Sequence, residues 1–245
     1  MHRLAKLLFV AGLCLLLAAL WKKHELPAPG LLQPALQEEP LQKAVTMPAF
    51  ERSVGQINYR IQPLYRYELW GLVVSRHDSD TWWDYLHKEW NDRLNVADLC
   101  VLWGDNLNNA SYGQVSFSSG QFTCYFQTDS NEVYQAFDQT AISNNHLLSD
   151  DPELIRRIKN TRVGDQIHFR GYLAEYSHEH GTPFRRGTST TRSDTGNGAC
   201  ETVFLEEFTI LKQGGGPWYK LQWLGIALMV LGSIAWIAAP VRLRN

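Results

Sequence analysis

The chain has 245 residues, with 23 Lys and Arg against 25 Asp and Glu, and its formal net charge at pH 7 is −2. Seven basic residues lie at or beside the two ends, at positions 3, 6, 22, 23, 220, 242 and 244, so 16 remain among the 25 acidic residues of the middle. Because a nucleic-acid binder presents a basic face to phosphates, this acidic middle argues against nucleic acid as a partner. The length suits one domain of ordinary size plus attachments.

Two apolar runs mark the ends of the chain. Residues 7–21 carry no charge and are bordered by lysines and Arg3. A cleaved signal peptide needs small residues at its cleavage site, and none follow this run, so we predict an uncleaved N-terminal transmembrane anchor over 1–23. The second run begins beside Trp218, Tyr219 and Trp223, as an interfacial aromatic belt does, and predicts a C-terminal transmembrane helix over 218–241.

The orientation of these helices follows from their flanking Lys and Arg residues. The balance favours both termini in the cytoplasm. In a bacterial inner membrane this two-pass topology would place the middle of the chain in the periplasm.

The composition of the chain between the two apolar runs divides it into a linker, a folded domain and a hinge. Residues 24–49 hold five of the ten prolines and predict a Pro-rich, semi-extended linker. Residues 213–217 include three consecutive glycines and predict a hinge. The folded, extracytoplasmic domain is therefore expected over 50–212.

Hydrophobic periodicity predicts the elements of this domain. Strands are expected over 67–75, 97–103, 115–127, 166–176 and 201–211, and helices over 81–94, 131–141 and 152–159. The helix at 81–94 rests on the spacing of Trp83, Leu86, Trp90 and Leu94. The polar run 143–146 is interpreted as a loop after the second helix, or as the edge of a site.

The order of these elements, with GDQIHFRGYLAEYS at 164–177 and CETVFLEEFTIL at 200–211, resembles an OB-fold. The expected fold class is therefore mainly β with helices: an OB-fold-like β-barrel with a helical insertion, flanked by N- and C-terminal transmembrane helices. The resemblance also implies a binding role for the connections 76–96 and 177–199. No functionally named family is indicated.

The domain holds three cysteines. Cys100 and Cys124 lie on consecutive predicted strands around Tyr112, so a hairpin there would pair them in a disulfide in an oxidising compartment. Two buried free thiols are the alternative. Cys200 could be a core thiol, a disulfide partner of either cysteine, or a nucleophile served by His146, His178 or His180.

The segment 177–199 is the main candidate binding loop. Its three arginines, with several hydroxyl groups, could hold an anionic group; an ordered solvent loop is the alternative. His178 and His180 have a spacing that can hold a metal ion, but a third ligand would have to come from elsewhere, so no metal and no cofactor is predicted. The candidate binding residues are His178, His180, Arg185, Arg186, Thr188, Ser189, Arg192, Asp194 and Asn197.

No decisive catalytic motif occurs, so the catalytic residues remain unassigned. We expect a membrane-anchored binding or accessory module that engages a partner protein or an anionic envelope component through 177–199. The alternative is a thiol- or metal-dependent enzyme that uses Cys200 or the pair His178 and His180.

Overall fold

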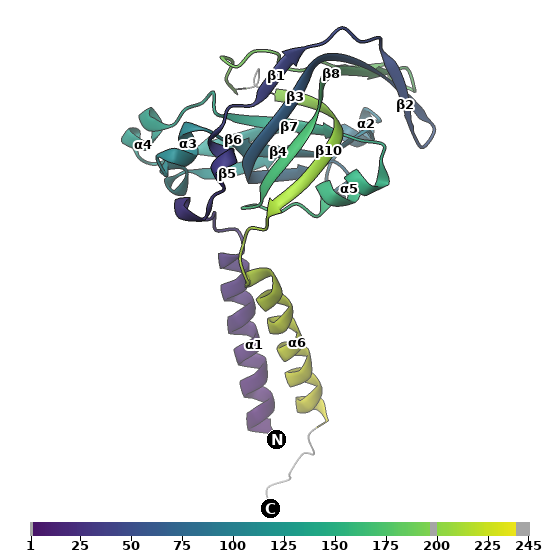
Figure 1. Cartoon of the computed structure of the whole chain (residues 1–245). Coiled ribbons are helices and arrows are strands. Elements are labelled where there is room, and N and C mark those ends of the chain that lie inside the picture. The colour runs from purple at the N-terminus through teal and green to yellow at the C-terminus, as the bar shows by residue number, and fades with distance from the viewer. Residues whose placement is uncertain (1, 197–199, 239–245) are drawn as a thin grey trace, which may run out of the picture. The chain divides into compact units, whose positions relative to one another are not determined.

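The structure is a computed structural model that describes residues 2–196 and 200–238. The chain forms two compact units (Figure 1). One contains the terminal segments up to Glu25 and from Gly214, and the other is the domain Leu26–Gln213.

The terminal unit is a pair of helices, α1 (His2–Lys22) and α6 (Trp218–Ile237). Both are long and apolar enough to cross a membrane. They match the predicted N- and C-terminal helices, except that residues 239–241 lie outside the described part of the chain.

Small residues allow α1 and α6 to pack closely. A Cβ atom added to Gly12 would lie 2.7 Å from the carbonyl oxygen of Gly225, and one added to Gly232 would lie 2.7 Å from the backbone nitrogen of Phe9. The two helix backbones therefore touch at glycines, which is how helices associate where no hydrophobic effect drives them together.

We expect Gly12→Leu and Gly225→Leu to separate the two helices, since the added side chains would occupy the neighbouring backbone. The measurement is the yield of an intramolecular cross-link between cysteines introduced at Leu16 and Leu228, whose atoms lie at these glycines. The matched control is Leu17→Val, because Leu17 is 58% exposed. An unchanged yield in the glycine variants would contradict this packing.

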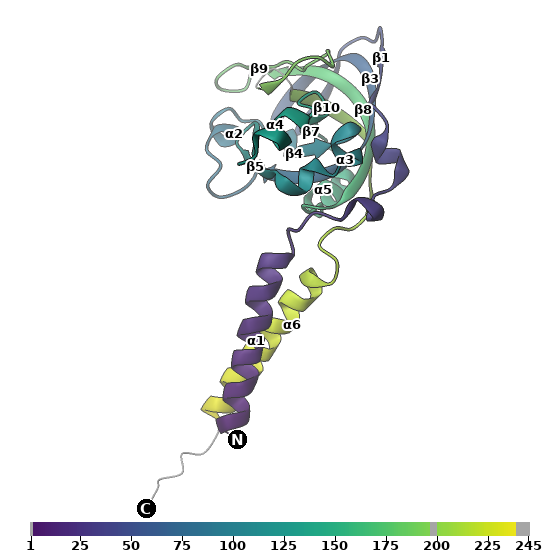
Figure 2. The same cartoon turned by 90° about the vertical axis from the view of Figure 1, so that its left-hand side faces the viewer.

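The domain is built on a large mixed sheet whose hydrogen bonds close into a ring (Figures 1 and 2). Strands β7 and β10 pair in parallel, and the other neighbours in the ring are antiparallel. In order around the ring the strands are β3 (Ile57–Asp78), β4 (Asn95–Leu102), β7 (Ile142–Leu148), β10 (Cys200–Lys212) and β8 (Gln166–His178). Three short strands, β1 (Leu41–Ala44), β2 (Phe50–Val54) and β9 (Phe184–Arg186), extend it.

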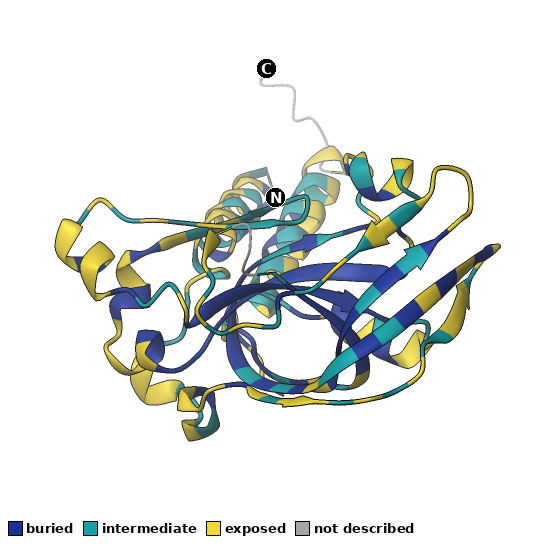
Figure 3. Ribbon diagram, turned by 90° about the horizontal axis from the view of Figure 1, so that it is seen from above, coloured by how far each residue is buried: buried dark blue, intermediate teal, exposed yellow. Residues whose placement is uncertain are grey.

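Alternation along the ring strands separates two faces. Leu99 and Val101 on β4, with Leu147 and Val203 on the next strands, belong to the largest hydrophobic cluster. The residues between them point to the opposite face. The central strands are mostly buried (Figure 3), because other segments cover that second face as well.

Helix α5 (Pro152–Lys159) packs against β4 and β10. The Asp151 carboxylate accepts a hydrogen bond from the Glu153 N–H at 2.7 Å, which caps the helix, and the predicted range 152–159 is confirmed. Strands β4, β8 and β10 likewise lie close to their predicted ranges.

The Pro-rich stretch differs from a free spacer. It contains two short 3₁₀ turns, η1 (Pro29–Leu31) and η2 (Pro34–Gln37), and strand β1, which pairs with β3. Leu36 is fully buried, and its carbonyl oxygen accepts a hydrogen bond from the Gly104 N–H at 3.0 Å. The stretch from Leu26 onward is thus part of the domain unit, held by apolar burial that proline content alone does not reveal.

The predicted helix over 81–94 is wrong. Only one turn forms, α2 (Leu86–Glu89), and Trp82 and Trp83 are exposed. Of the predicted apolar stripe only Leu94 is buried; the other buried side chains of this range are Asp84, His87 and Asp92, and Asp84 accepts a hydrogen bond from the His87 N–H at 3.0 Å. Buried polar contacts therefore override the aromatic periodicity.

The predicted strand over 115–127 is two strands. These are β5 (Ser116–Gly120) and β6 (Thr123–Gln127), a separate hairpin that turns at Phe122 with a φ of 63°. The third ring strand is instead β7, which contains the polar run 143–146 and is buried along its whole length. The loop assigned to that run was wrong, since its polar side chains pair with other buried groups.

The remaining short helices are α3 (Asp105–Asn108), η3 (Ser111–Gln114) and α4 (Asn131–Ala136). Helix α4 confirms the start of the helix predicted over 131–141, but it ends five residues earlier. Its cap is Ser130, whose hydroxyl accepts a hydrogen bond from the Val133 N–H at 3.2 Å.

The predicted disulfide Cys100–Cys124 is confirmed. It does not arise from a hairpin around Tyr112, because β6 pairs with β5 and β4 pairs with β3 and β7. The bond instead ties the β5–β6 hairpin to β4. A hydrogen bond of 2.7 Å between the Ser75 and Ser119 hydroxyls adds a second tie.

Candidate functional site

Two rows of chemically active side chains cross four ring strands on one face. The first row is His77, Asp98, His146 and Thr202, which are successive Cα partners on β3, β4, β7 and β10. The second row is Ser75, Cys100, Asn144 and Cys200. Paired residues on neighbouring strands point to the same face, so all eight side chains share the face opposite the main hydrophobic cluster.

Three segments that are far apart in the sequence cover this face. Phe122, at the tip of the β5–β6 hairpin, lies with its ring centroid 3.9 Å from that of His87, in the 79–94 connection. The guanidinium of Arg186, on β9, lies 3.7 Å from the centroid of the same Phe122 ring. The rows are therefore enclosed by both connections that the OB-fold resemblance singled out, and by a hairpin that it did not.

Asp98 is the centre of the first row. It is fully buried, and its carboxylate accepts hydrogen bonds from His146 Nδ1 at 2.6 Å, from Asn95 Nδ2 at 2.8 Å and from the Phe122 N–H at 3.0 Å. Burial alone raises the pKa of Asp98, but the charge and hydrogen bond of His146, with the Asn95 bond, lower it to about 2. The carboxylate is therefore charged throughout the physiological range.

His146 is held between this carboxylate and two further groups. Burial lowers the pKa of His146, but the charge of Asp98 and hydrogen bonds to Asp98 and Cys200 raise it to about 9. Arg186 Nη1 lies 2.9 Å from His146 Nε2 and donates to it only when the ring is neutral, since a protonated ring has no lone pair there. Protonation of His146 must therefore displace the Arg186 hydrogen bond.

Cys200 borders a cavity of about 50 Å³. It is a free, partly exposed thiol, and the cavity is also lined by Cys124 of the disulfide and by Asn144. Asn144 is 3% exposed, yet neither its amide oxygen nor its amide nitrogen has a hydrogen-bond partner in the described structure. A buried unpaired polar group costs about 1–3 kcal/mol, so Asn144 marks a position suited to a bound polar group.

The Cys200 thiol, the His146 imidazole and the Asp98 carboxylate lie on three neighbouring strands, β10, β7 and β4. Such an arrangement supports nucleophilic catalysis, because the imidazole takes the thiol proton and the carboxylate orients and stabilises the resulting imidazolium. Of the three bases that the sequence offered for Cys200, His146 lies on the neighbouring strand, and Cys200 contributes to its raised pKa.

The three arginines of the candidate binding loop have partners within the domain. Arg185 pairs with Glu175 at 2.5 Å, and Arg186 contacts His146 and Phe122 as described. Arg192 pairs with the buried Glu201. These charges stabilise the loop against the sheet.

The polar residues of the loop also bond internally. Thr188 Oγ1 accepts a hydrogen bond from the Thr202 N–H at 2.9 Å, and the Ser189 hydroxyl donates to the Asp194 carboxylate. Asn197 lies outside the described residues.

His178 and His180 do not face a common ligand. His178 Nε2 donates to the Trp90 carbonyl oxygen at 2.8 Å, and His178 Nδ1 accepts from the His180 N–H at 3.1 Å. With both ring nitrogens of His178 engaged, this residue ties the two loops together.

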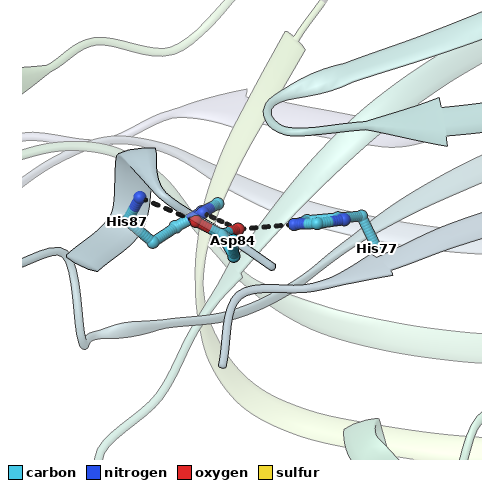
Figure 4. A group of neighbouring side chains, drawn as sticks. All are labelled: His77, Asp84 and His87. Atoms are coloured by element: carbon cyan, nitrogen blue, oxygen red, sulfur yellow. Dashed lines mark hydrogen bonds and ion pairs between the residues drawn. The ribbon is translucent and has the colours of Figure 1, made fainter. Parts of the chain in front are cut away.

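A different group of three residues could hold a metal ion: His77, Asp84 and His87 (Figure 4). Asp84 lies between the two imidazoles, with its Oδ2 2.5 Å from His77 Nε2 and 2.6 Å from His87 Nδ1. Sequence reasoning missed the group because it assigned 81–94 to an amphipathic helix. The sequence does contain a pattern that could have indicated this group: Asp84 and His87 have an Asp-x-x-His spacing, and His77 lies seven residues before Asp84.

Comparisons of the chain with protein-family models, curated proteins and solved structures find no match. The function must therefore be inferred from the site itself.

We expect His146→Gln to slow the alkylation of Cys200 by iodoacetamide at neutral pH by roughly tenfold or more, because no base would then hold the thiol proton. The background is Cys14→Ser, which leaves Cys200 as the one free cysteine. Asp98→Asn should slow the reaction too, and the control is His180→Gln, which changes an exposed histidine. An unchanged rate in a folded His146→Gln protein would show that the thiol and the imidazole are not coupled.

Proposed function

We propose that the protein is a membrane-anchored enzyme that uses the Cys200 thiol as a nucleophile in acyl transfer. The observation that carries this proposal is the hydrogen bond of His146 to Asp98, together with the influence of Cys200 on the pKa of His146, the three residues lying on adjacent strands of one sheet face. His146 is the proton acceptor and Asp98 is the positioning group.

The pKa of about 9 leaves His146 protonated at neutral pH, so the proposed reaction begins from a Cys200 thiolate and the His146 imidazolium, whose Nε2–H replaces the Arg186 hydrogen bond. The thiolate then attacks an acyl carbonyl carbon, so that a C–S bond forms, and the bond to the leaving group breaks as His146 returns the proton to that group. Water attacks the resulting thioester, which releases a carboxylic acid and restores the thiol. The unpaired Asn144 amide, in the same cavity, is suited to donate a hydrogen bond to the oxyanion.

The ring order supports an OB-fold-like barrel as the scaffold. The strands follow the sequence β3, β4, β7, β10, β8 and return to β3, with α5 between the third and fourth strands in chain order. In this scaffold β7 takes the place that the sequence assigned to 115–127, and both connections that cover the site are the ones the family uses for binding.

The two terminal helices and the disulfide support an extracytoplasmic domain. A disulfide persists in oxidising compartments and is rare in the cytosol. In the proposed topology both termini lie in the cytoplasm of a bacterial cell, and the domain lies in the periplasm.

A membrane-impermeant thiol reagent tests this topology in cells whose outer membrane has been permeabilised. We expect Cys124 to be labelled only after reduction, because it is bonded to the buried Cys100, is itself partly exposed and would lie in the periplasm. The Cys100→Ser/Cys124→Ser variant is the control for the assignment of the label. Labelling of these cysteines only after the inner membrane is broken would place the domain in the cytoplasm.

An activated ester tests the chemistry. With p-nitrophenyl acetate, the purified full chain should release a burst of about one p-nitrophenolate per chain, and intact mass should show one acetyl group that hydroxylamine removes, as expected of a thioester. Cys200→Ser should abolish the burst, whereas Cys14→Ser should retain it. A burst that survives in Cys200→Ser, or acetylation at other residues alone, would refute the thiol mechanism.

A binding module for a partner protein or an envelope component is the second candidate. Three large aromatic side chains in the 79–94 connection are exposed, Trp82 by 89%, Trp83 by 51% and Tyr85 by 63%. Exposed aromatic residues are enriched where proteins bind partners. This function would not require Cys200, so a protein that shows no thiol acylation would leave it as the better supported of the two.

A further inference from the structure

The group His77, Asp84 and His87 is separate from the thiol and takes no part in the proposed reaction. His77 lies at the end of β3, Asp84 lies in the following connection, and His87 lies on α2. All three side chains are at most 2% exposed. One possible metal-ligand atom from each side chain lies within 4.8 Å of those from the other two. Buried groups of this kind need either internal hydrogen bonds or an ion.

We propose that His77, Asp84 and His87 bind one Zn²⁺ ion, with His77 Nε2, His87 Nδ1 and a carboxylate oxygen of Asp84 as ligands. Two imidazole nitrogens and one carboxylate form a ligand set that zinc uses where a fourth position stays open for water or substrate. The harder cations Mg²⁺ and Ca²⁺ prefer sets made of oxygen atoms, so this set selects against them.

In the structure the three side chains hydrogen-bond to one another; we call this arrangement the closed form of the site. Asp84 Oδ2 accepts from both imidazoles at 2.5 and 2.6 Å. Around a tetrahedral Zn²⁺ ion with bonds of about 2.0–2.1 Å, ligand atoms lie about 3.3 Å apart, so each Asp84–imidazole distance must lengthen by roughly 0.7–0.8 Å. The two imidazole nitrogens, which lie within 4.8 Å of each other, must take up the same separation. The ion replaces the two N–H donors, and each imidazole moves its proton to its other nitrogen.

The surroundings offer an acceptor for the proton of His87. His87 Nε2 lies 3.0 Å from the side-chain amide of Asn95, whose carbonyl oxygen is buried and has no partner among the described residues. That oxygen can accept the His87 proton once the amide turns. Zinc-bound histidines ordinarily have such a partner on their second nitrogen. His77 Nδ1 is also buried and without a partner in the described structure, so its hydrogen bonding is incomplete in the closed form.

A cavity borders this group. It has a volume of about 420 Å³ and is lined by His87, Asn95 and Asp92, with Lys88, Arg93 and Lys159 among the charged residues around it. Asp92 contributes another buried oxygen, Oδ1, that has no partner in the described chain. Of the three proposed ligands, His87 lines the cavity, so the cavity borders the site from the His87 side.

The test is the zinc content of the purified full chain in detergent, prepared without a polyhistidine tag, stripped with a chelator, reloaded with Zn²⁺ and desalted. We expect about one zinc ion per chain in the wild type. His77→Gln/His87→Gln should lose the ion, and Asp84→Asn should bind it at least about 100-fold more weakly. His180→Gln and Cys200→Ser are the controls, and both should keep it.

Co²⁺ titration covers the case in which the histidine variants fail to fold. In the wild type, bound Co²⁺ should give the intense visible bands of a four-coordinate site, and one equivalent of Zn²⁺ should remove them. The proposal is overturned if the wild type retains no zinc, if it gives only weak six-coordinate Co²⁺ bands, or if folded His77→Gln/His87→Gln binds zinc like the wild type. Loss of zinc in Cys200→Ser would also overturn it. Since the readout is metal content, a failure here is distinct from a failure of the acyl-transfer proposal.

Discussion

The buried carboxylate of Asp98 is the constraint on which the rest of the site depends. A charge placed in the middle of a sheet, with no exposure to solvent, would be very unfavourable without full hydrogen bonding. Its partners come from three parts of the chain: His146 on β7, Asn95 at the start of β4, and the backbone of Phe122 in the hairpin. Each of these segments is thereby fixed in position on the face of the sheet.

This constraint explains why the covering segments have irregular structure. The hairpin must bring the Phe122 N–H to Asp98, and the disulfide and the Ser75–Ser119 bond hold it there. The connection 79–94 must place His87 against Asn95, so it cannot continue as an amphipathic helix with its aromatic residues buried. Loops that carry buried polar contacts at the end of a rigid sheet are common places for function.

The thiol group and the histidine–aspartate group are linked through this network. Asn95 donates to Asp98 and also contacts His87, so one amide joins the residues around Cys200 to the proposed zinc site. The two proposals use different residues for their chemistry, because the thiol reaction uses His146 and Asp98, whereas the ion would be bound by His77, Asp84 and His87. The Asn95 amide couples them, since turning it toward His87 gives up its hydrogen bond to Asp98. Their proximity does explain why so many polar groups are buried on one sheet face.

The sequence by itself determined the elements that depend on local patterns. The terminal helices, strands β8 and β10 and the range of α5 were predicted from nearby residues. The Cys100–Cys124 pair was predicted as well, although through a hairpin that the structure does not form. Only the tertiary structure decided that the polar run of β7 lies in the centre of the sheet, and that Cys200 lies beside His146. The physical reason is that strand register and buried hydrogen bonds join residues far apart in the chain. The hydrophobic periodicity of a single segment does not specify which other strand will pair with it.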